Sequence, residues 1–141
     1  MYKPKYFSEK EMRITKDTPE NIRLNALNIA EKVLDPFREF IKKPITVNSW
    51  YRTPEYNKQV GGAKNSQHTT GEAVDFVVKG MTNEEIYDSI IKMKLPFDQL
   101  ILENGNGTTW IHISLKMVGT NRREVLKALK TKGKWGYTKI K

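Results

Sequence analysis

Both histidines of the chain lie in short stretches whose residue types suit a metal site. His68 belongs to SQHTTGEAVD, residues 66–75, which ends in Asp75, and His112 belongs to WIHIS, residues 110–114. A catalytic zinc ion usually takes its protein ligands from imidazoles and carboxylates and keeps one position open for water or substrate. His68, Asp75 and His112 supply such a set. Metal-dependent hydrolysis is therefore the leading hypothesis from these residues.

The spacing of the three residues allows them to meet. His68 and Asp75 are seven residues apart, with Gly71 between them, where the backbone can turn without steric cost. His112 follows 37 residues later in TTWIHISL, a run with the two-residue alternation of a strand. Asp75 begins an apolar run, so its carboxylate is expected to be buried. Burying that charge is costly unless a cation or several hydrogen-bond donors meet it. Each histidine by itself also fits an ordinary hydrogen-bonded core residue.

A wider pattern carries a family resemblance. The motif SxHxxGxAxD is formed by Ser66, His68, Gly71, Ala73 and Asp75, and a WxH follows in the expected strand. With VNSWYRTPEYNKQVGGAKNSQH upstream, the chain resembles the zinc D-Ala-D-Ala carboxypeptidase family (M15-type peptidases, with the Hedgehog/D-Ala-D-Ala peptidase fold). The similarity runs from about residue 7 to about residue 115 and is greatest to the small single-domain members, which include phage endolysin peptidases.

The resemblance implies both a cofactor and an activity. One Zn²⁺ ion would be held by His68, Asp75 and His112. The enzyme would cut peptide bonds next to D-amino acids in peptidoglycan stem peptides, as a carboxypeptidase or as an endopeptidase that degrades the cell wall.

A hydrolytic metal site also needs a general base near the attacking water, and Glu103 is the candidate. It ends the run FDQLILE, and the NGNG segment that follows, residues 104–107, indicates a tight turn between two strands. Such a turn pairs Glu103 roughly with Trp110. Its side chain then emerges on the same face as His112, because that face is shared by positions two apart.

The resemblance contains one departure at the base. In several relatives, including the vancomycin-resistance dipeptidases, the acidic base lies three residues before the last histidine, and here that position is Thr109. The base must therefore come from another place. Glu103 suits the shorter phage-like branch, in which the acid ends the preceding strand. A solvated carboxylate beside a turn is the alternative interpretation of Glu103.

Arg52 is the main candidate for substrate binding. It ends ITVNSWYR, and a guanidinium can grip a planar carboxylate with two parallel hydrogen bonds. By similarity, this arginine contacts the substrate or stabilises the oxyanion near the metal. Further substrate-binding candidates are Ser66, Gln67 and Trp110. Ligating imidazoles normally give their other N–H to an acceptor, and Asp98 and Glu72 are the candidates for that role.

Capping signals and periodicity predict a single α+β domain with a central antiparallel sheet that carries the ligands and with helices mainly on one side. Capping boxes are expected at Ser8/Glu11 and Thr82/Glu85, and Pro36 should kink or split the helix that begins at Thr18-Pro19. The expected strands are 45–52, 72–78, 97–103 and 109–115, and further helices are expected at 53–60, 82–94 and 121–130.

Composition limits the compartment and the partners. The chain has 141 residues and no cysteine, so one domain without thiolate ligands is expected, over residues 1–141 with a basic tail from about 131. No apolar run has the length of a secretory signal or a membrane span. A soluble protein of the host cytoplasm or of a virion, brought to the wall by another component, fits this pattern. A monomer is favoured.

The basic C-terminal segment leaves alternatives open. The net charge is +9, and six lysines follow Glu124 with no acidic residue among them. Such a surface attracts anionic wall polymers and nucleic acid alike, and Trp135 and Tyr137 could stack on bases or sugars. The alternatives to a peptidase are therefore a zinc-containing wall or virion module without catalysis, as in the Hedgehog signalling domain, and a basic nucleic-acid-binding domain.

Overall fold

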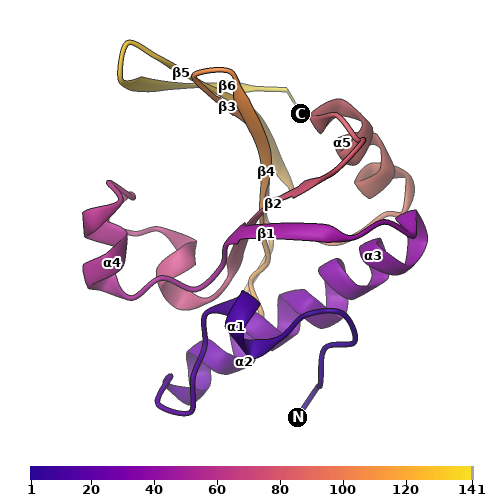
Figure 1. The fold of residues 1–141 in the computed structure, drawn as a ribbon, viewed down its shortest axis with the longest axis vertical. Coiled ribbons are helices and arrows are strands. Elements are labelled where there is room, and N and C mark those ends of the chain that lie inside the picture. Colours follow the sequence, from indigo (N-terminus) through magenta and orange to yellow (C-terminus); the bar gives the residue numbers. More distant parts are fainter. Residues whose placement is uncertain (141) are drawn as a thin grey trace.

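A six-stranded mixed sheet forms the centre of the molecule in the computed structural model, which describes residues 1–140 (Figure 1). The strand order is β1-β2-β4-β3-β5-β6. The strands are β1 (Ile45–Ser49), β2 (Ala73–Val78), β3 (Gln99–Gly105), β4 (Thr108–Ser114), β5 (Glu124–Thr131) and β6 (Lys134–Lys139). All neighbours pair antiparallel except β3 and β5, which are parallel. The α+β class is confirmed, with one parallel pairing in a sheet expected to be antiparallel.

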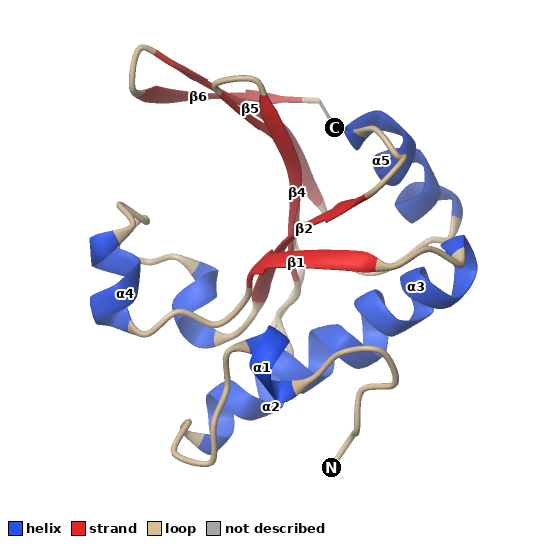
Figure 2. Cartoon of the chain, in the orientation of Figure 1, coloured by secondary structure: helices blue, strands red, loops and turns tan. Residues whose placement is uncertain are grey.

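The helices lie mainly before and between the first strands (Figure 2). They are α1 (Glu9–Met12), α2 (Glu20–Ile29), the π-helical turn η1 (Ala30–Leu34), α3 (Asp35–Ile41), α4 (Pro54–Gln59), the 3₁₀ turn η2 (Gln67–Thr70) and α5 (Asn83–Lys92). Both expected capping boxes are present, at α1 and α5. Among the described residues, no helix has the length and apolarity that crossing a membrane would require.

Pro36 divides the long N-terminal helix as expected. The α-helical pattern ends at Ile29, the π turn follows, and α3 begins with Pro36 in its first turn. Proline has no N–H for the helical hydrogen bond and its ring crowds the preceding turn, so a widened turn just before it relieves both problems.

Alternation along the central strands gives the sheet two different faces. Val74 and Phe76 of β2, like Ile111 and Ile113 of β4, are fully buried in the main hydrophobic core with α2, α3 and α5. The residues between them, such as Asp75 and His112, point to the opposite face, because successive side chains of a strand alternate. Figure 1 shows α3 and α5 on one side of the sheet and α4 on the other. The apolar face is thus covered, and the polar face borders a cleft.

The C-terminal segment differs from its sequence prediction. Residues 121–130 were expected to form a helix, but β5 begins at Glu124 and runs parallel to β3. The segment from about 131, expected as a tail, forms β6, which pairs with β5 through a turn at Lys132 and Gly133. Pairing with the open edge of β3 outweighs the helix propensity of leucine, alanine and lysine, which is only a weak preference.

Candidate metal centre and active-site cleft

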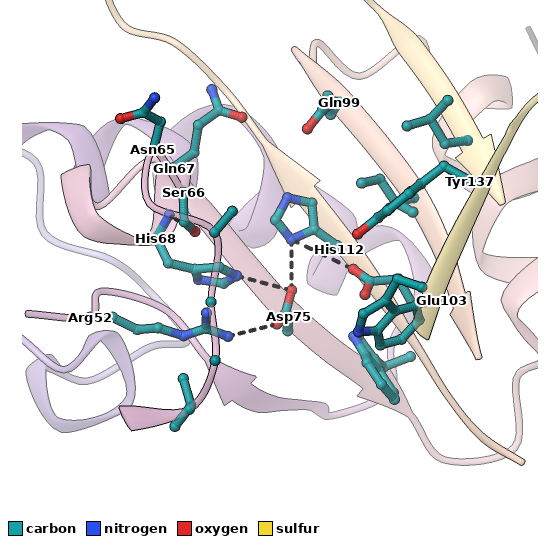
Figure 3. A pocket seen from close by; sticks show the side chains of 18 of the residues that line it. Arg52, Asn65, Ser66, Gln67, His68, Asp75, Gln99, Glu103, His112 and Tyr137 are labelled. Atoms are coloured by element: carbon teal, nitrogen blue, oxygen red, sulfur yellow. Dashed lines mark hydrogen bonds and ion pairs between the residues drawn. The ribbon is translucent and has the colours of Figure 1, made fainter. Parts of the chain in front are cut away.

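Three segments of the chain bring His68, Asp75 and His112 together (Figure 3). His68 lies in η2, Asp75 in β2 and His112 in β4, where Asp75 and His112 are paired neighbours. One possible ligand atom from each residue lies within 4.8 Å of the others. The shared atom is Oδ1 of Asp75, which is 3.2 Å from Nε2 of His68 and 2.8 Å from Nδ1 of His112. Two nitrogens and a carboxylate oxygen therefore converge on one point.

His68 is oriented by the backbone. Its Nδ1 lies 2.7 Å from the carbonyl oxygen of Trp50, which fixes the ring when Nδ1 carries the proton. Its Nε2 is then the free atom, and it is buried without a hydrogen-bond partner. The prediction that Asp98 or Glu72 holds a ligating imidazole was wrong: among the described residues, Asp98 bonds to Arg122 and Gln67, and Glu72 to Thr70.

The electrostatics of the cluster favour a cation. Burial would raise the pKa of Asp75, but the hydrogen bond from His112 and the adjoining imidazole of His68 hold it well below its ordinary value. Burial would lower the pKa of His112, but the hydrogen bond and charge of Asp75, with the charge of Glu103, raise it instead. The cluster thus favours positive charge beside the Asp75 carboxylate. An orphaned buried nitrogen beside a carboxylate is the kind of site that a zinc ion satisfies.

Glu103 faces the cluster from the adjacent strand. Asn106 and Gly107 both have positive φ angles, 55° and 89°, so the turn has the form that joins strands tightly, and Glu103 pairs with Trp110 as expected. One carboxylate oxygen of Glu103 lies 3.8 Å from Nδ1 of His112. Burial raises the pKa of Glu103 to about 7, and the charge of Asp75 adds to the rise. Such a group can both accept and release a proton near neutral pH.

The sequence model of the family Peptidase M15 matches residues 5–114. The chain belongs to the peptidase M15 family. M15 enzymes are zinc-dependent peptidases, and the converging His68, Asp75 and His112 of this member could hold such a metal. No curated protein matches the chain. The matched residues include η2 and β1 to β4 but not β5 and β6, so one part of this M15 protein's sheet lies outside the family match.

Arg52 of this M15 site lies beside Asp75, with Nη2 3.5 Å from Oδ2 of the carboxylate. Its Nε donates to Ser49 Oγ at 3.0 Å and its Nη1 donates to Asn57 Oδ1 at 3.1 Å. Gly62 makes room for this arrangement, because a Cβ there would lie 2.0 Å from Asn57 Oδ1. These three contacts hold the guanidinium in one orientation at the edge of the cleft.

The M15 site lies in a cleft of about 680 Å³. The expected substrate-binding residues Arg52, Ser66, Gln67 and Trp110 all line it. Ser66 also accepts a hydrogen bond from the backbone N–H of His68 and so begins η2. The opposite wall comes from Leu126, Lys130, Trp135 and Tyr137 of β5 and β6, and sequence reasoning missed this wall. The alternation of Trp135 and Tyr137 after a Lys-Gly turn was the sequence pattern that could have predicted strand β6.

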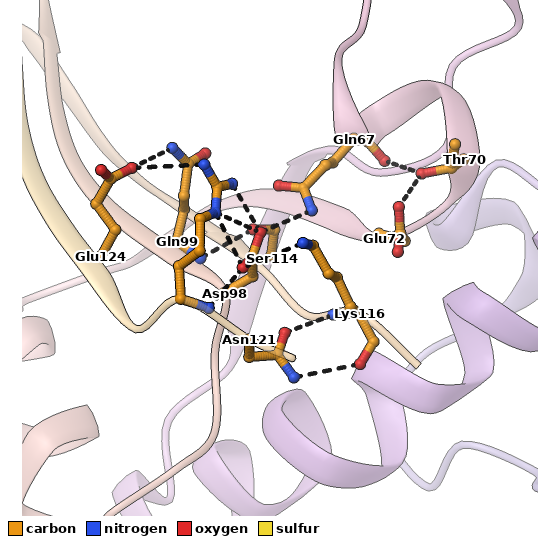
Figure 4. Close-up of polar contacts among 10 residues, drawn as sticks. Gln67, Thr70, Glu72, Asp98, Gln99, Ser114, Lys116, Asn121 and Glu124 are labelled. Carbon is orange, nitrogen blue, oxygen red and sulfur yellow. Dashed lines mark hydrogen bonds and ion pairs between the residues drawn. The ribbon is translucent and has the colours of Figure 1, made fainter. Parts of the chain in front are cut away.

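A buried carboxylate joins the two walls (Figure 4). The Asp98 side chain is completely buried and accepts from Arg122 Nη2 at 2.7 Å, from the Arg122 backbone N–H at 2.8 Å and from Gln67 Nε2 at 3.0 Å. Burial works against its charge, but these donors lower the pKa of Asp98 to about 2. Because Gln67 precedes His68 and Arg122 precedes β5, Asp98 couples the positions of the histidine segment and the C-terminal hairpin.

Proposed function

We propose that this M15 protein is a zinc-dependent peptidase that cuts bonds next to D-amino acids in peptidoglycan stem peptides. The observation that carries the proposal is the convergence of Glu103 on the cluster of His68, Asp75 and His112 inside one cleft. A structural zinc site is normally closed by four protein ligands, whereas three ligands and a nearby carboxylate suit catalysis.

The residues of the site divide the chemistry between them. His68, Asp75 and His112 would hold a zinc ion, which supplies Lewis acidity at the scissile carbonyl and lowers the pKa of water. Glu103 accepts a proton from the attacking water as its oxygen bonds to the carbonyl carbon. It then gives the proton to the leaving amine as the C–N bond breaks. Arg52, on the other side of Asp75, donates to the substrate or to the developing oxyanion.

The substrate part of the proposal rests on family membership and on the motif at residues 66–75. Whether the enzyme removes a terminal D-residue or cuts within the stem, and whether it acts as a phage endolysin, belong to this proposal too. The basic groups along β5 and β6 favour an anionic wall surface, which carries carboxylates and phosphates.

The proposal is tested by mass spectrometry of peptidoglycan stem peptides after incubation with the zinc-loaded protein. We expect new fragments, whose masses identify the bond, and a loss of about 10²–10⁴-fold in rate for Glu103→Gln. Glu84→Gln, on the exposed surface of α5, is the matched control and should keep full rate. Zinc bound to the wild type without any cleavage would instead support the non-catalytic wall or virion module.

A further inference from the structure

The hairpin of β5 and β6 places Tyr137 in line with the proposed base. Ala128 of β5 pairs with Glu103 on one side and with Tyr137 on the other, so the three side chains share one face of the sheet. Figure 3 shows the Tyr137 hydroxyl pointing into the cleft, toward the space beside His112 and Glu103.

Trp135 extends this wall along the same face of β6. Its ring meets that of Trp110 edge-on, at 5.9 Å between centroids and 84° between planes. Gly105 permits the contact, because a Cβ there would lie 2.9 Å from Trp110 and 3.4 Å from Trp135. Tyr137 follows at 6.5 Å with a tilt of 30°. The two rings of β6 thus form a continuous aromatic surface that ends beside the metal cluster.

This aromatic surface packs against Trp110 at one edge and is exposed to solvent at the other. Trp135 is 36% exposed and Tyr137 58% exposed, although both line the cleft. Within residues 1–140, no hydrogen bond joins the Tyr137 hydroxyl to another side chain or to the backbone. Partial burial and the charge of Glu103 raise the pKa of Tyr137, so its phenol stays a neutral donor. The aromatic rings can pack on an apolar part of a ligand, and the free hydroxyl of Tyr137 can donate to a polar group beside it.

We propose that Trp135 and Tyr137 form a substrate-binding subsite, in which the rings pack on the peptide residue next to the scissile bond and the Tyr137 hydroxyl donates to a backbone carbonyl of that residue. The subsite rests on the proposed peptidase function. A peptide is the occupant because the surface leads directly to Glu103 and the cluster, where the peptide bond would be cut. Since β5 and β6 lie outside the residues that the family model matches, this subsite does not follow from family membership.

The test compares Tyr137→Phe with Thr138→Val. Both remove one hydroxyl from β6, but Thr138 lies on the opposite face of the strand, beside α5. Affinity for an uncleaved stem peptide is measured by titration in the zinc-loaded Glu103→Gln background, and kcat/KM is measured in the otherwise wild-type protein. We expect Tyr137→Phe to weaken peptide binding and to lower kcat/KM by about 5-fold each, the effect of one lost hydrogen bond. Thr138→Val should change neither, and thermal unfolding should be the same for both variants.

A second variant tests the rings. Trp135→Ala should weaken the affinity for the peptide further, by about 10-fold or more. Peptide binding should change the tryptophan fluorescence of both the parent protein and Tyr137→Phe, because both keep Trp135. If stem peptides are cleaved but Tyr137→Phe matches the parent in affinity and rate, the subsite is overturned and the peptidase function stands. If the parent neither cleaves nor binds any stem peptide while zinc is bound, both proposals fail.

Discussion

Arg52 contributes geometry as well as charge to the site. Its three nitrogens contact three different acceptors, on Ser49, Asn57 and Asp75. A lysine ammonium is a point charge on a flexible stem and cannot reproduce this planar arrangement. The side chain is therefore fixed in one orientation, which is what its proposed role in stabilising the oxyanion requires.

We expect Arg52→Lys to lower kcat/KM by about 10-fold or more, because the charge remains but the fixed donors are lost. Stem-peptide cleavage measures the rate, and zinc titration in the same samples measures metal affinity. Unchanged zinc affinity would place the loss at the substrate. A parallel fall in zinc affinity would show instead that Arg52 acts by holding Asp75, and an unchanged kcat/KM would contradict the substrate-binding role.

Asp98 links stability to pH. Its pKa falls from an ordinary value of 3.8 to about 2 on folding. A carboxylate with a depressed folded pKa stabilises the protein fully above its unfolded pKa, and this stability is lost as the pH falls through the folded value. The contribution should thus be complete at pH 5 and above and should disappear between about pH 4 and pH 2.

We expect Asp98→Asn to lower the free energy of unfolding by about 1–2 kcal/mol more at pH 7 than at pH 2. Urea denaturation at pH 7, 4 and 2 measures the difference. Asp88→Asn, on the exposed side of α5, corrects for the general loss of a negative charge. A difference that stays constant across this pH range would contradict the lowered pKa of Asp98.

At the scale of elements, the turn after η2 positions both His68 and Asp75. Gly71 has a φ angle of 80°, and a Cβ there would lie 2.8 Å from the carbonyl oxygen of Ile22 in α2. The turn therefore packs directly against backbone, which cannot move aside as a flexible side chain can. Since η2 carries His68 and the next strand carries Asp75, a shift of this turn separates these two side chains of the cluster.

We expect Gly71→Ala to destabilise the protein by about 2 kcal/mol or more, from a left-handed conformation and a clash together, and to weaken zinc binding. Gly119→Ala is the matched control. Gly119 also has a positive φ angle, 93°, but has open space around it, so only the conformational cost of about 1 kcal/mol applies. Calorimetry and zinc titration of both variants measure the two effects. Equal losses would show that the contact with α2 is unimportant.

The elements also show where sequence reasoning succeeds. The Asn-Gly turn set the register of β3 and β4, so Glu103 and Trp110 could be paired in advance. Capping residues fixed the starts of α1 and α5 in the same local way. Strand β5 could not be predicted from local signals, because its residues favour a helix locally and its partner β3 is distant in sequence. Long-range pairing overrides weak local preference, and no short-range signal records it.

On the scale of the whole molecule, the site combines predictable and unpredictable parts. The proximity of His68, Asp75 and His112 was predictable from residue type and spacing, and the position of Glu103 from its turn. The hydrogen-bond partner of His68 was not predictable, because it is the backbone carbonyl of Trp50, and every residue has such a carbonyl. The wall of Trp135 and Tyr137 was missed with β5 and β6, since a cleft depends on which strands are neighbours.

The assembled cluster couples metal binding to the stability of the entire fold. His68, Asp75 and His112 come from η2, β2 and β4, so they meet only when the sheet and the segment before it are formed. A ligand that binds the folded state alone stabilises it by an amount set by its concentration relative to Kd. Zinc at about 100 times Kd should add about 2.7 kcal/mol and raise Tm by about 5–10 °C.

Thermal unfolding with zinc, with EDTA and with neither measures this coupling. Zinc should raise Tm and EDTA should reverse the rise, whereas His112→Ala, which lacks one ligand, should respond to neither at the same zinc concentration. The basic strands β5 and β6 cannot substitute for the cluster, because protonated lysines repel a cation. An equal rise in His112→Ala would therefore locate the bound zinc elsewhere. No rise in the wild type would mean that the hydrogen bond between His112 and Asp75, and not a metal, satisfies the site.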